Sequence, residues 1–361
     1  MLGVKEFGIV EGIISMKRIR LPFLPPGIEV EFSDRERALA QVEEMARKGT
    51  RAPLVVYGPE GCGKSAWLRQ SAEILKDAGY DVIYVDLVHR SYLSYTDVES
   101  VLNRLSDAAA DITGVTSLKL VTIVIDLVKE LVRLGKKKIA VLIDEAFQSI
   151  GLEKSAVYVK SLLSLIEYPP RSYESIVAVA TTSEGLTRSE IGRHRWADIS
   201  PLWNMSQEGF MDLYEQINWE RGGYPPPPGF TAEDAWHITG GNPYMLSVLA
   251  EAGWSPKKAA ERMVSLRKLL YFVNSLSMDE KIWLSEAVED PDTLFTRERI
   301  PLLDKLVERN LVVDDVPSRS PDLWIDTPPP EKDTELGIGK HVAWQTPLHR
   351  EAVKLALKAS T

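Results

Sequence analysis

The sequence predicts an α/β fold: a parallel five-stranded sheet between helices, followed by an all-α lid and a mixed C-terminal domain. Two observations lead to this prediction. Five short apolar runs alternate with helical patterns up to about residue 204, which is typical of a parallel sheet covered by helices on both faces. From Ser206 the strand signal disappears and helical patterns dominate, until helix and strand patterns mix again from about Ser275.

Length and composition indicate a globular chain of two or three domains. The 361 residues are 44% hydrophobic, include one cysteine and carry a net charge of −9. A single cysteine excludes an intramolecular disulfide framework, and every apolar run is shorter than the roughly 18 residues of a membrane span. We therefore expect a cytoplasmic location. Six asparagines and six glutamines beside 26% charged residues fit either a thermophilic source or a bias of genome composition.

The pattern divides the chain into four expected regions. Residues 1–31 form an N-terminal extension, and residues 32–204 form the α/β core. Residues 205–272 form the helical lid. Residues 273–361 follow the order helix, helix, strand and hairpin, which is typical of a winged-helix domain; residues 324–344 are expected to supply the hairpin.

Two helix starts are predicted from capping boxes. Ser33 and Glu36 have the required spacing at the start of the core, and Ser277 and Glu280 have it in the C-terminal region. In this motif the hydroxyl accepts a hydrogen bond from the backbone of the third helical residue, whose carboxylate bonds back. We expect a helix to begin directly after each serine.

The octapeptide from Gly58 to Ser65 matches G-x-x-x-x-G-K-[ST] and directly follows the apolar run 54–57. Glycines let the chain curl so that successive N–H groups face one anion, and the next helix points its positive dipole end at the same place. Lys64 adds a full charge and Ser65 offers a hydroxyl to Mg²⁺. We therefore expect a P-loop NTPase. Its nucleotide-binding residues would be Gly58, Pro59, Glu60, Gly61, Cys62, Gly63, Lys64, Ser65 and Ala66.

An acidic pair, Asp144 and Glu145, follows the all-apolar run 139–143. The carboxyl ends of strands are where ligands bind in open α/β sheets, so the pair is expected to face the phosphate loop. Asp144 would hold hydrated Mg²⁺ and Glu145 would orient and deprotonate the attacking water. The alternative is a solvated acidic pair, and Asp86 is a rival metal carboxylate without an adjacent glutamate. In this NTPase class we expect one further strand between the phosphate-loop strand and the acidic strand.

Two groups of polar side chains follow the next predicted strand. The hydroxyl-bearing residues would hydrogen-bond the attacking water or the γ-phosphate, or belong to a plain turn. Among them we favour Thr182 as the residue that makes this hydrogen bond. The arginines would stabilise the charge of the transition state, or lie on a solvated helix. The hydroxyl candidates are Thr181, Thr182 and Ser183, and the arginine candidates are Arg188, Arg193 and Arg195.

These motifs resemble the archaeal ATPase family within the STAND branch of AAA+ NTPases, whose members join an ATPase core, a helical lid and a winged helix. Residues 32–36 look like the family's F-x-D-R-E opening near the adenine, which implies that Arg35 binds the nucleotide. Gly192 and Arg193 are similar to a G-R pair that follows the sensor strand, which favours Arg193. Pro243 lies in a sequence that looks like the G-x-P motif of the lid.

The resemblance implies Mg-dependent binding and slow hydrolysis of ATP, with ATP, ADP and Mg²⁺ as ligands. The implied catalytic residues are Glu145, Lys64, Thr182 and Arg193, and the implied metal ligands are Ser65 and Asp144.

Three functions are compatible with such a site: a nucleotide-driven conformational switch, a DNA-acting initiator or transposition helper, and a protein that holds ATP as a structural ligand. Glu145 argues against the third. Residues 273–361 contain 11 Lys and Arg against 17 Asp and Glu, a net charge of −6, whereas a duplex-binding domain should be basic. We therefore favour the switch, with a protein partner bound through the lid or the winged helix.

Overall fold

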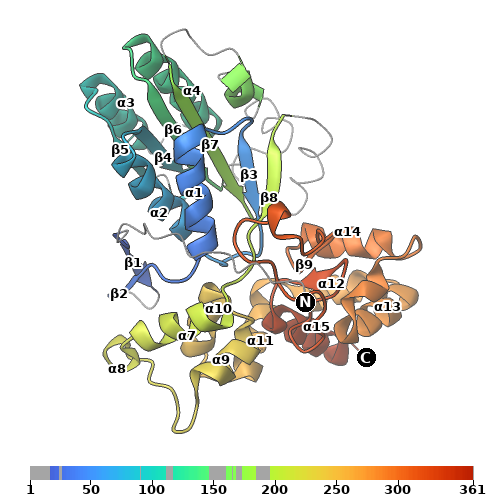
Figure 1. Cartoon of the computed structure of the whole chain (residues 1–361). Coiled ribbons are helices and arrows are strands. Elements are labelled where there is room, and N and C mark those ends of the chain that lie inside the picture. The colour runs from blue at the N-terminus through green and yellow to red at the C-terminus, as the bar shows by residue number, and fades with distance from the viewer. Residues whose placement is uncertain are drawn as a thin grey trace, which may run out of the picture.

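The structure is a computed structural model, and it describes part of the chain. The described residues are 17–23, 27–89, 91–110, 117–145, 160–164, 166–167, 173–183 and 196–360. Figure 1 shows a sheet with its helices in the upper half of the molecule and helices α7 to α15 below it. Among the described residues, no helix is both long and apolar enough to cross a membrane.

The sheet is a mostly parallel layer with the strand order β5-β4-β6-β7-β3-β8. Its strands are β3 (Leu54–Tyr57), β4 (Asp81–Asp86), β5 (Ser91–Tyr95), β6 (Lys138–Asp144), β7 (Ser175–Thr182) and β8 (Asp198–Pro201). Strand β7 pairs in parallel with both β3 and β6. The prediction of one strand between the phosphate-loop strand and the acidic strand is therefore confirmed.

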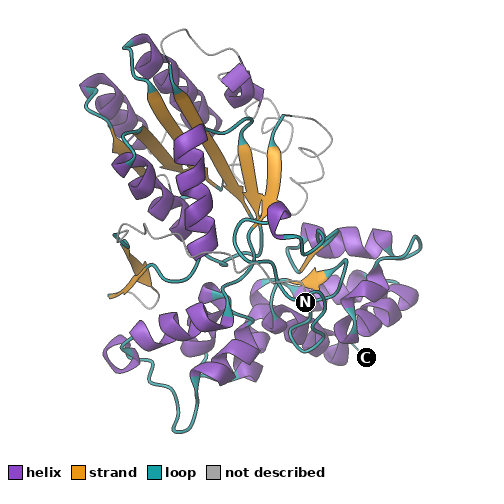
Figure 2. Cartoon of the chain, in the orientation of Figure 1, coloured by secondary structure: helices purple, strands orange, loops and turns teal. Residues whose placement is uncertain are grey.

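Helices cover both faces of the sheet (Figure 2). On one face, α1 (Glu36–Lys48) and α2 (Lys64–Asp77) share a core with alternate residues of β4, β6 and β7. On the other face, α3 (Glu99–Ala110) and α4 (Ser117–Arg133) pack on the intervening residues of the same strands. Because successive side chains of a strand point to opposite faces, the part of a strand buried on both faces is apolar throughout, as residues 139–143 of β6 are.

The sheet has one strand more than the five predicted. Strand β5 pairs antiparallel with β4, in the register that joins Val82 to Tyr95 and Asp86 to Ser91. Its sequence Ser-Tyr-Leu-Ser-Tyr lacks the continuous apolar pattern of the central strands, because β5 lies at the edge of the sheet.

The N-terminal extension contributes a two-stranded hairpin, β1 (Arg20–Phe23) with β2 (Ile28–Glu31). The chain then enters α1 without the predicted serine cap. The N-cap residue is Arg35, with φ 71°, and no side chain caps the helix. The cap prediction is wrong at Ser33 because Asp34 also adopts a positive φ, 63°, which turns the chain before the helix begins.

Helices follow one another after Ser206, as the helical patterns there predicted. The helices are α7 (Gln207–Gln216), α8 (Trp219–Gly222), α9 (Ala232–Thr239), α10 (Pro243–Glu251), α11 (Pro256–Leu266) and α12 (Leu269–Ser275). Helix α10 begins with Pro243 in its first turn and is capped by the side chain of Asn242, which accepts from the Met245 N–H. Proline suits this position because the first helical N–H has no partner within the helix.

The C-terminal region combines helices with one short strand pair. Its elements are α13 (Met278–Glu289), α14 (Ile300–Glu308), β9 (Val312–Val313), β10 (Ala343–Trp344) and α15 (Pro347–Ala359), with 3₁₀ turns at Pro291–Leu294 and Pro321–Leu323. The capping box of Ser277 and Glu280 is confirmed.

The predicted pairing of Trp324 in a hairpin with the 342–344 run is wrong: β10 pairs with β9, and Ile325 instead forms a parallel bridge with Leu202 beside β8. The indole of Trp324 packs edge-on against Trp203, so this segment docks on the core.

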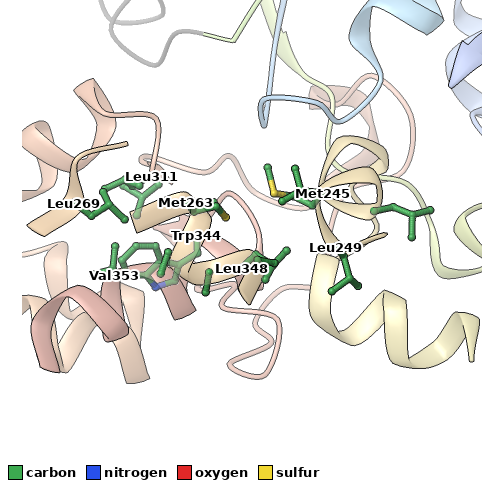
Figure 3. Packing of buried hydrophobic residues seen from close by; sticks show 14 of the residues in the cluster. Met245, Leu249, Met263, Leu269, Leu311, Trp344, Leu348 and Val353 are labelled. Atoms are coloured by element: carbon green, nitrogen blue, oxygen red, sulfur yellow. The ribbon is translucent and has the colours of Figure 1, made fainter. Parts of the chain in front are cut away.

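One hydrophobic core joins the helices of residues 205–275 to the C-terminal region. Figure 3 shows residues from α10 and α11 near residues from α12, β10 and α15. The labelled side chains are Met245, Leu249, Met263, Leu269, Leu311, Trp344, Leu348 and Val353. Helix α15 packs against α11, α12 and α13 and so closes this core.

Candidate active site

The phosphate loop has a backbone that only glycine suits at two points. A Cβ at Gly58 would lie 1.9 Å from the carbonyl oxygen of Leu202, so the loop passes directly over the chain that leaves β8. Gly61 has φ +77°, and a Cβ there would lie 2.3 Å from the Cβ of Tyr244. The loop therefore packs against both the core and the first turn of α10.

Open space lies over the loop at the start of α2. Gly63 is the N-cap of this helix with φ 100°, and a Cβ built on it meets no atom within 4 Å. The Nζ of Lys64 is folded back and donates to the carbonyls of Gly58, at 3.0 Å, and Pro59, at 2.9 Å. Loop, lysine and helix N-terminus thus leave room for an anion and supply the donors that would hold one.

Two cavities meet at this point. A cavity of about 280 Å³ is lined by polar groups, among them Lys64, Ser65 and Glu145. A second cavity of about 190 Å³ is lined mainly by apolar groups, among them Phe32 and Pro243. Both are lined by Leu21, Pro22, Gly63 and Ala66. The pair has the chemistry of a nucleotide site, with an apolar end for the base and a cationic end for the phosphates.

Asp144 ends β6 as a fully buried carboxylate with two hydrogen-bond donors. Its Oδ1 accepts from the Thr181 hydroxyl at 2.6 Å, and its Oδ2 accepts from the Tyr84 hydroxyl at 3.0 Å. Burial raises the pKa of Tyr84, with the Asp144 charge as the next cause, so its hydroxyl stays protonated. Each oxygen of Asp144 keeps further acceptor capacity, because an ionised carboxylate has about four acceptor positions.

Glu145 reaches the polar cavity from the next position. Its φ is 47°, a left-handed conformation that is uncommon for a residue with a side chain. Its N–H donates to Thr181 Oγ1 at 3.2 Å, and its carboxylate accepts from the N–H of Ser183 at 3.1 Å and from the Ser183 hydroxyl. The turn at the end of β6 is thereby tied to the end of β7.

Asp86, the rival carboxylate, is engaged in its own turn. Its Oδ1 accepts from the N–H groups of Val88, at 3.1 Å, and His89, at 2.9 Å. Its Oδ2 lies 2.8 Å from Nδ1 of His89 and 3.9 Å from the guanidinium of Arg69. Asp86 itself lines the polar cavity, whereas Asp144 ends β6 directly before Glu145, so both carboxylates remain candidates to hold a metal. Among the described residues, His, Cys, Asp and Glu form no cluster of three that could hold a metal by themselves.

Of the other predicted residues, Thr182 lies among the described residues and Arg193 does not. Thr182 is fully buried, and it pairs with Tyr57 where β7 runs beside β3. Because successive side chains of a strand point to opposite faces of the sheet, Thr182 lies on the face opposite Thr181. The hydroxyl contacts with the acidic pair come from Thr181 and Ser183 instead. Arg193 lies outside the described residues, together with Arg188 and Arg195.

Arg35 lines the apolar cavity, but its guanidinium faces the protein. Its Nη2 donates to the carbonyls of Cys62 and Trp203, both at 2.8 Å. Its Nη1 forms a 3.0 Å ion pair with Asp326, and the two side chains are 3% and 6% exposed. Arg35 therefore joins the phosphate loop to the proline-rich stretch of the C-terminal region, a contact that no sequence motif indicates.

Glu60, at the tip of the phosphate loop, contacts three distant segments. Its N–H donates to Oε1 of Gln345, and its carbonyl accepts from the side chain of Asn242, both at 2.9 Å. Its carboxylate forms a 2.7 Å ion pair with Arg267, at the end of α11. We call these contacts the loop clamp. Nothing in the sequence pattern singles out Arg267 or Gln345, because their role depends on how the helices pack.

A sequence model of an ATPase domain found predominantly in Archaea matches residues 32–249. This chain belongs to that ATPase family. The match includes the phosphate loop, the acidic pair and Pro243, so the resemblance read from these motifs is confirmed at the level of the family. The chain is an ATP-binding protein and an ATP hydrolase, a class of enzyme whose usual cofactor is Mg²⁺.

Solved structures from Aeropyrum pernix and Thermotoga maritima are similar to this ATPase. The Aeropyrum pernix ORC2 protein in its ADP form shares 16% identity, with a TM-score of 0.40 over 90% of this chain and 93% of that one. The A. pernix ORC1 protein in complex with DNA shares 15% identity, with a TM-score of 0.35 over 93% and 95%. A Thermotoga maritima RuvB variant shares 14% identity, with a TM-score of 0.33 over 75% and 86%. No curated protein matches the chain.

Proposed function

We propose that the ATPase hydrolyses ATP with Mg²⁺ held by Ser65 and Asp144, and with Glu145 as the base that activates water. The observation that carries this proposal is the polar cavity, because Lys64, Ser65 and Glu145 all line it. Bound Mg²⁺ would supply positive charge at the outer phosphates. The residues fit the ion, since Mg²⁺ takes oxygen ligands, keeps several waters and needs only one or two carboxylates.

The protein's own groups perform the rest. The loop N–H groups would bind the phosphates, and Lys64 would exchange the carbonyls of Gly58 and Pro59 for phosphate oxygens, which carry more negative charge. Phe32 and Pro243 would contact the base in the apolar cavity. Arg35 would act on the nucleotide indirectly, by holding the Cys62 carbonyl in the loop.

Glu145 would accept the proton of the attacking water. Its carboxylate is oriented by Ser183, so the base is fixed before the substrate arrives. Thr182 remains a proposed partner of the γ-phosphate because it ends β7, and Arg193 remains one because the family resemblance favours the G-R pair.

Two substitutions test this assignment. Lys64→Ala should abolish ATP binding, because it removes the only positively charged side chain of the loop. Glu145→Gln should keep ATP binding and lose turnover, because the amide cannot accept the proton. Binding by fluorescence anisotropy and phosphate release by a coupled assay measure the two effects. Equal hydrolysis by Glu145→Gln and wild type would remove Glu145 from its role.

We further propose that nucleotide binding drives a conformational switch of the STAND type between the core (32–204), the lid (205–272) and a winged-helix domain (273–361). The loop clamp supports this proposal. Asn242 and Arg267 from the lid and Gln345 from the C-terminal region all bind Glu60, so a change in the loop on binding phosphate alters contacts with both regions. A ligand that favours one arrangement of these contacts shifts the population towards it.

A protein is the better candidate partner than DNA. The region 273–361 carries a net charge of −6, and a phosphate backbone is bound through clustered cations. Titration of a labelled duplex at low salt tests this choice. We expect no saturation in the micromolar range; binding at micromolar affinity or better that weakens steeply with salt would favour a DNA-acting ATPase instead.

A further inference from the structure

An arginine and a tyrosine connect the polar cavity to Asp144. Tyr84, on β4, is buried and donates its hydroxyl proton to Asp144 Oδ2 at 3.0 Å. Arg69, on α2, lies one helical turn after Ser65, and its Nε–H donates to the same hydroxyl oxygen at 3.2 Å. Its guanidinium also lies 5.6 Å from the centre of the Tyr84 ring. Because Arg69 lines the polar cavity, the connection begins where the phosphates would bind.

The direction of these hydrogen bonds follows from the donors. An arginine side chain donates and never accepts, so the Tyr84 oxygen is the acceptor of the Arg69 bond. Its single proton is then available to Asp144. The Thr181 hydroxyl donates to the other carboxylate oxygen at 2.6 Å. Both oxygens of Asp144 are thereby oriented before any ion is present.

The register of the sheet explains why a tyrosine stands here. Tyr84 pairs with Leu142, and Asp86 pairs with Asp144, in parallel strands. The four side chains therefore share one face of the sheet, the face covered by α2. A shorter side chain at position 84 would end within the apolar layer, whereas tyrosine places its hydroxyl beside the carboxylate at the strand end.

We propose that Tyr84 and Arg69 are positioning residues for Mg²⁺ at Asp144. This inference rests on the proposed role of Asp144 in holding the ion. Mg²⁺ demands near-octahedral geometry, and hydrogen bonds to a ligand's other positions fix its orientation. Tyr84 supplies that bond, and Arg69 fixes the direction of the tyrosine hydroxyl. Because Arg69 also lines the polar cavity, the arriving triphosphate acts on the same network that orients the carboxylate.

Tyr84→Phe tests the proposal, with Tyr80→Phe as the matched control. Tyr80 is also buried, and its hydroxyl donates to the Ala46 carbonyl and accepts from the Ser175 hydroxyl, at the opposite end of the sheet. Each variant loses one buried hydroxyl of the same kind. The readout is the affinity for AMP-PNP by isothermal titration calorimetry, once in excess Mg²⁺ and once in EDTA. The ratio of the two dissociation constants measures what the metal contributes.

We expect Tyr84→Phe to bind AMP-PNP in EDTA with the wild-type affinity. Its ratio of dissociation constants, EDTA over Mg²⁺, should be about tenfold smaller than that of the wild type, which is the size typical of removing a hydrogen bond to a metal ligand. Tyr80→Phe should keep the wild-type ratio. Arg69→Lys, which retains the cavity charge but not the Nε donor, should shift the ratio in the same direction, and it replaces Tyr84→Phe if that variant does not fold.

An unchanged ratio in a folded Tyr84→Phe, or an equal loss in Tyr80→Phe, overturns the inference and leaves the hydrolytic mechanism intact. A wild-type chain whose AMP-PNP affinity is the same with Mg²⁺ and with EDTA overturns the magnesium assignment of Asp144 as well. The two failures are therefore distinguishable.

Discussion

The buried ion pair between Arg35 and Asp326 gives the sharpest stability prediction. In Asp326→Ala the carboxylate is lost, and Arg35 keeps its charge at a position where its side chain is 3% exposed. Removing one partner of a buried pair costs about 3–5 kcal/mol, because the remaining charge is no longer compensated. The unpaired Arg35 regains hydration by moving outwards from the carbonyls of Cys62 and Trp203, which places the expected loss near the lower figure.

The assay is equilibrium unfolding in urea, followed by tryptophan fluorescence. Trp203 and Trp324 pack edge to face beside the ion pair, so this docked segment contributes to the signal. Asp322→Ala is the control, because Asp322 is exposed in the same stretch, and such a change usually stays within about 0.5 kcal/mol. A loss in Asp326→Ala no larger than that of Asp322→Ala would refute the reasoning and show that the pair adds little to stability.

Asp326→Ala should also weaken nucleotide binding. Arg35 donates to the Cys62 carbonyl. When the unpaired guanidinium moves towards solvent to become hydrated, this contact with the phosphate loop is lost. AMP-PNP affinity should fall several-fold, in line with one charge-assisted hydrogen bond of about 1.5 kcal/mol or more. Wild-type affinity together with lowered stability would separate the ion pair from the nucleotide site.

Two further predictions concern the phosphate loop and the C-terminal core. Gly61→Ala should reduce AMP-PNP affinity at least about tenfold, because the φ of +77° and the 2.3 Å approach of the new Cβ to Tyr244 force the loop to move. Gly229→Ala is the control, because Gly229 has a similar φ of +83° but open space around it. Equal affinities in the two variants would contradict the prediction. Burial, and then the charge of Arg267, hold the pKa of His349 well below its usual value, so the unfolded chain binds a proton that the folded chain does not. The free energy of unfolding should therefore fall as pH drops below about 6.5, and His349→Gln should lessen that fall; an identical pH profile in the variant would contradict this.

The phosphate loop and the acidic pair could be predicted because their chemistry is local. The spacing from Gly58 to Lys64 and the apolar strands before each motif are contained in short stretches of sequence. Their convergence on one cavity follows from parallel strands, whose carboxyl ends meet at the same edge of a sheet.

The contacts missed by sequence reasoning depend on packing between distant segments. Tyr84 meets Asp144 because of the strand register, and Asp326 meets Arg35 because residues 324–326 dock on the core. The expected hairpin at Trp324 is wrong for the same reason: an apolar run indicates burial but not the partner. Likewise, the spacing at Ser33 satisfies a capping box, but the positive φ values of the next two residues decide the geometry.

The N-terminal hairpin shows how a site residue can lack any motif. Leu21 and Pro22 line both cavities, and β1 continues from a segment held to α2 by Gln70, whose Oε1 accepts from the Ile19 N–H at 2.9 Å. Sequence periodicity gives no signal for this arrangement, since the strand has four residues and no buried face of its own. The extension thereby lines both cavities of the proposed nucleotide site.

The structure of the ATPase with Mg²⁺ and AMP-PNP tests the central claim most directly. We predict the base in the apolar cavity beside Phe32 and Pro243, the phosphates on the N–H groups before Ala66, and the ion between Ser65 and Asp144. The terminal phosphate should face Glu145. A nucleotide bound elsewhere, or a triphosphate that reaches the loop while Asp144 and Glu145 stay remote from it, would contradict the account.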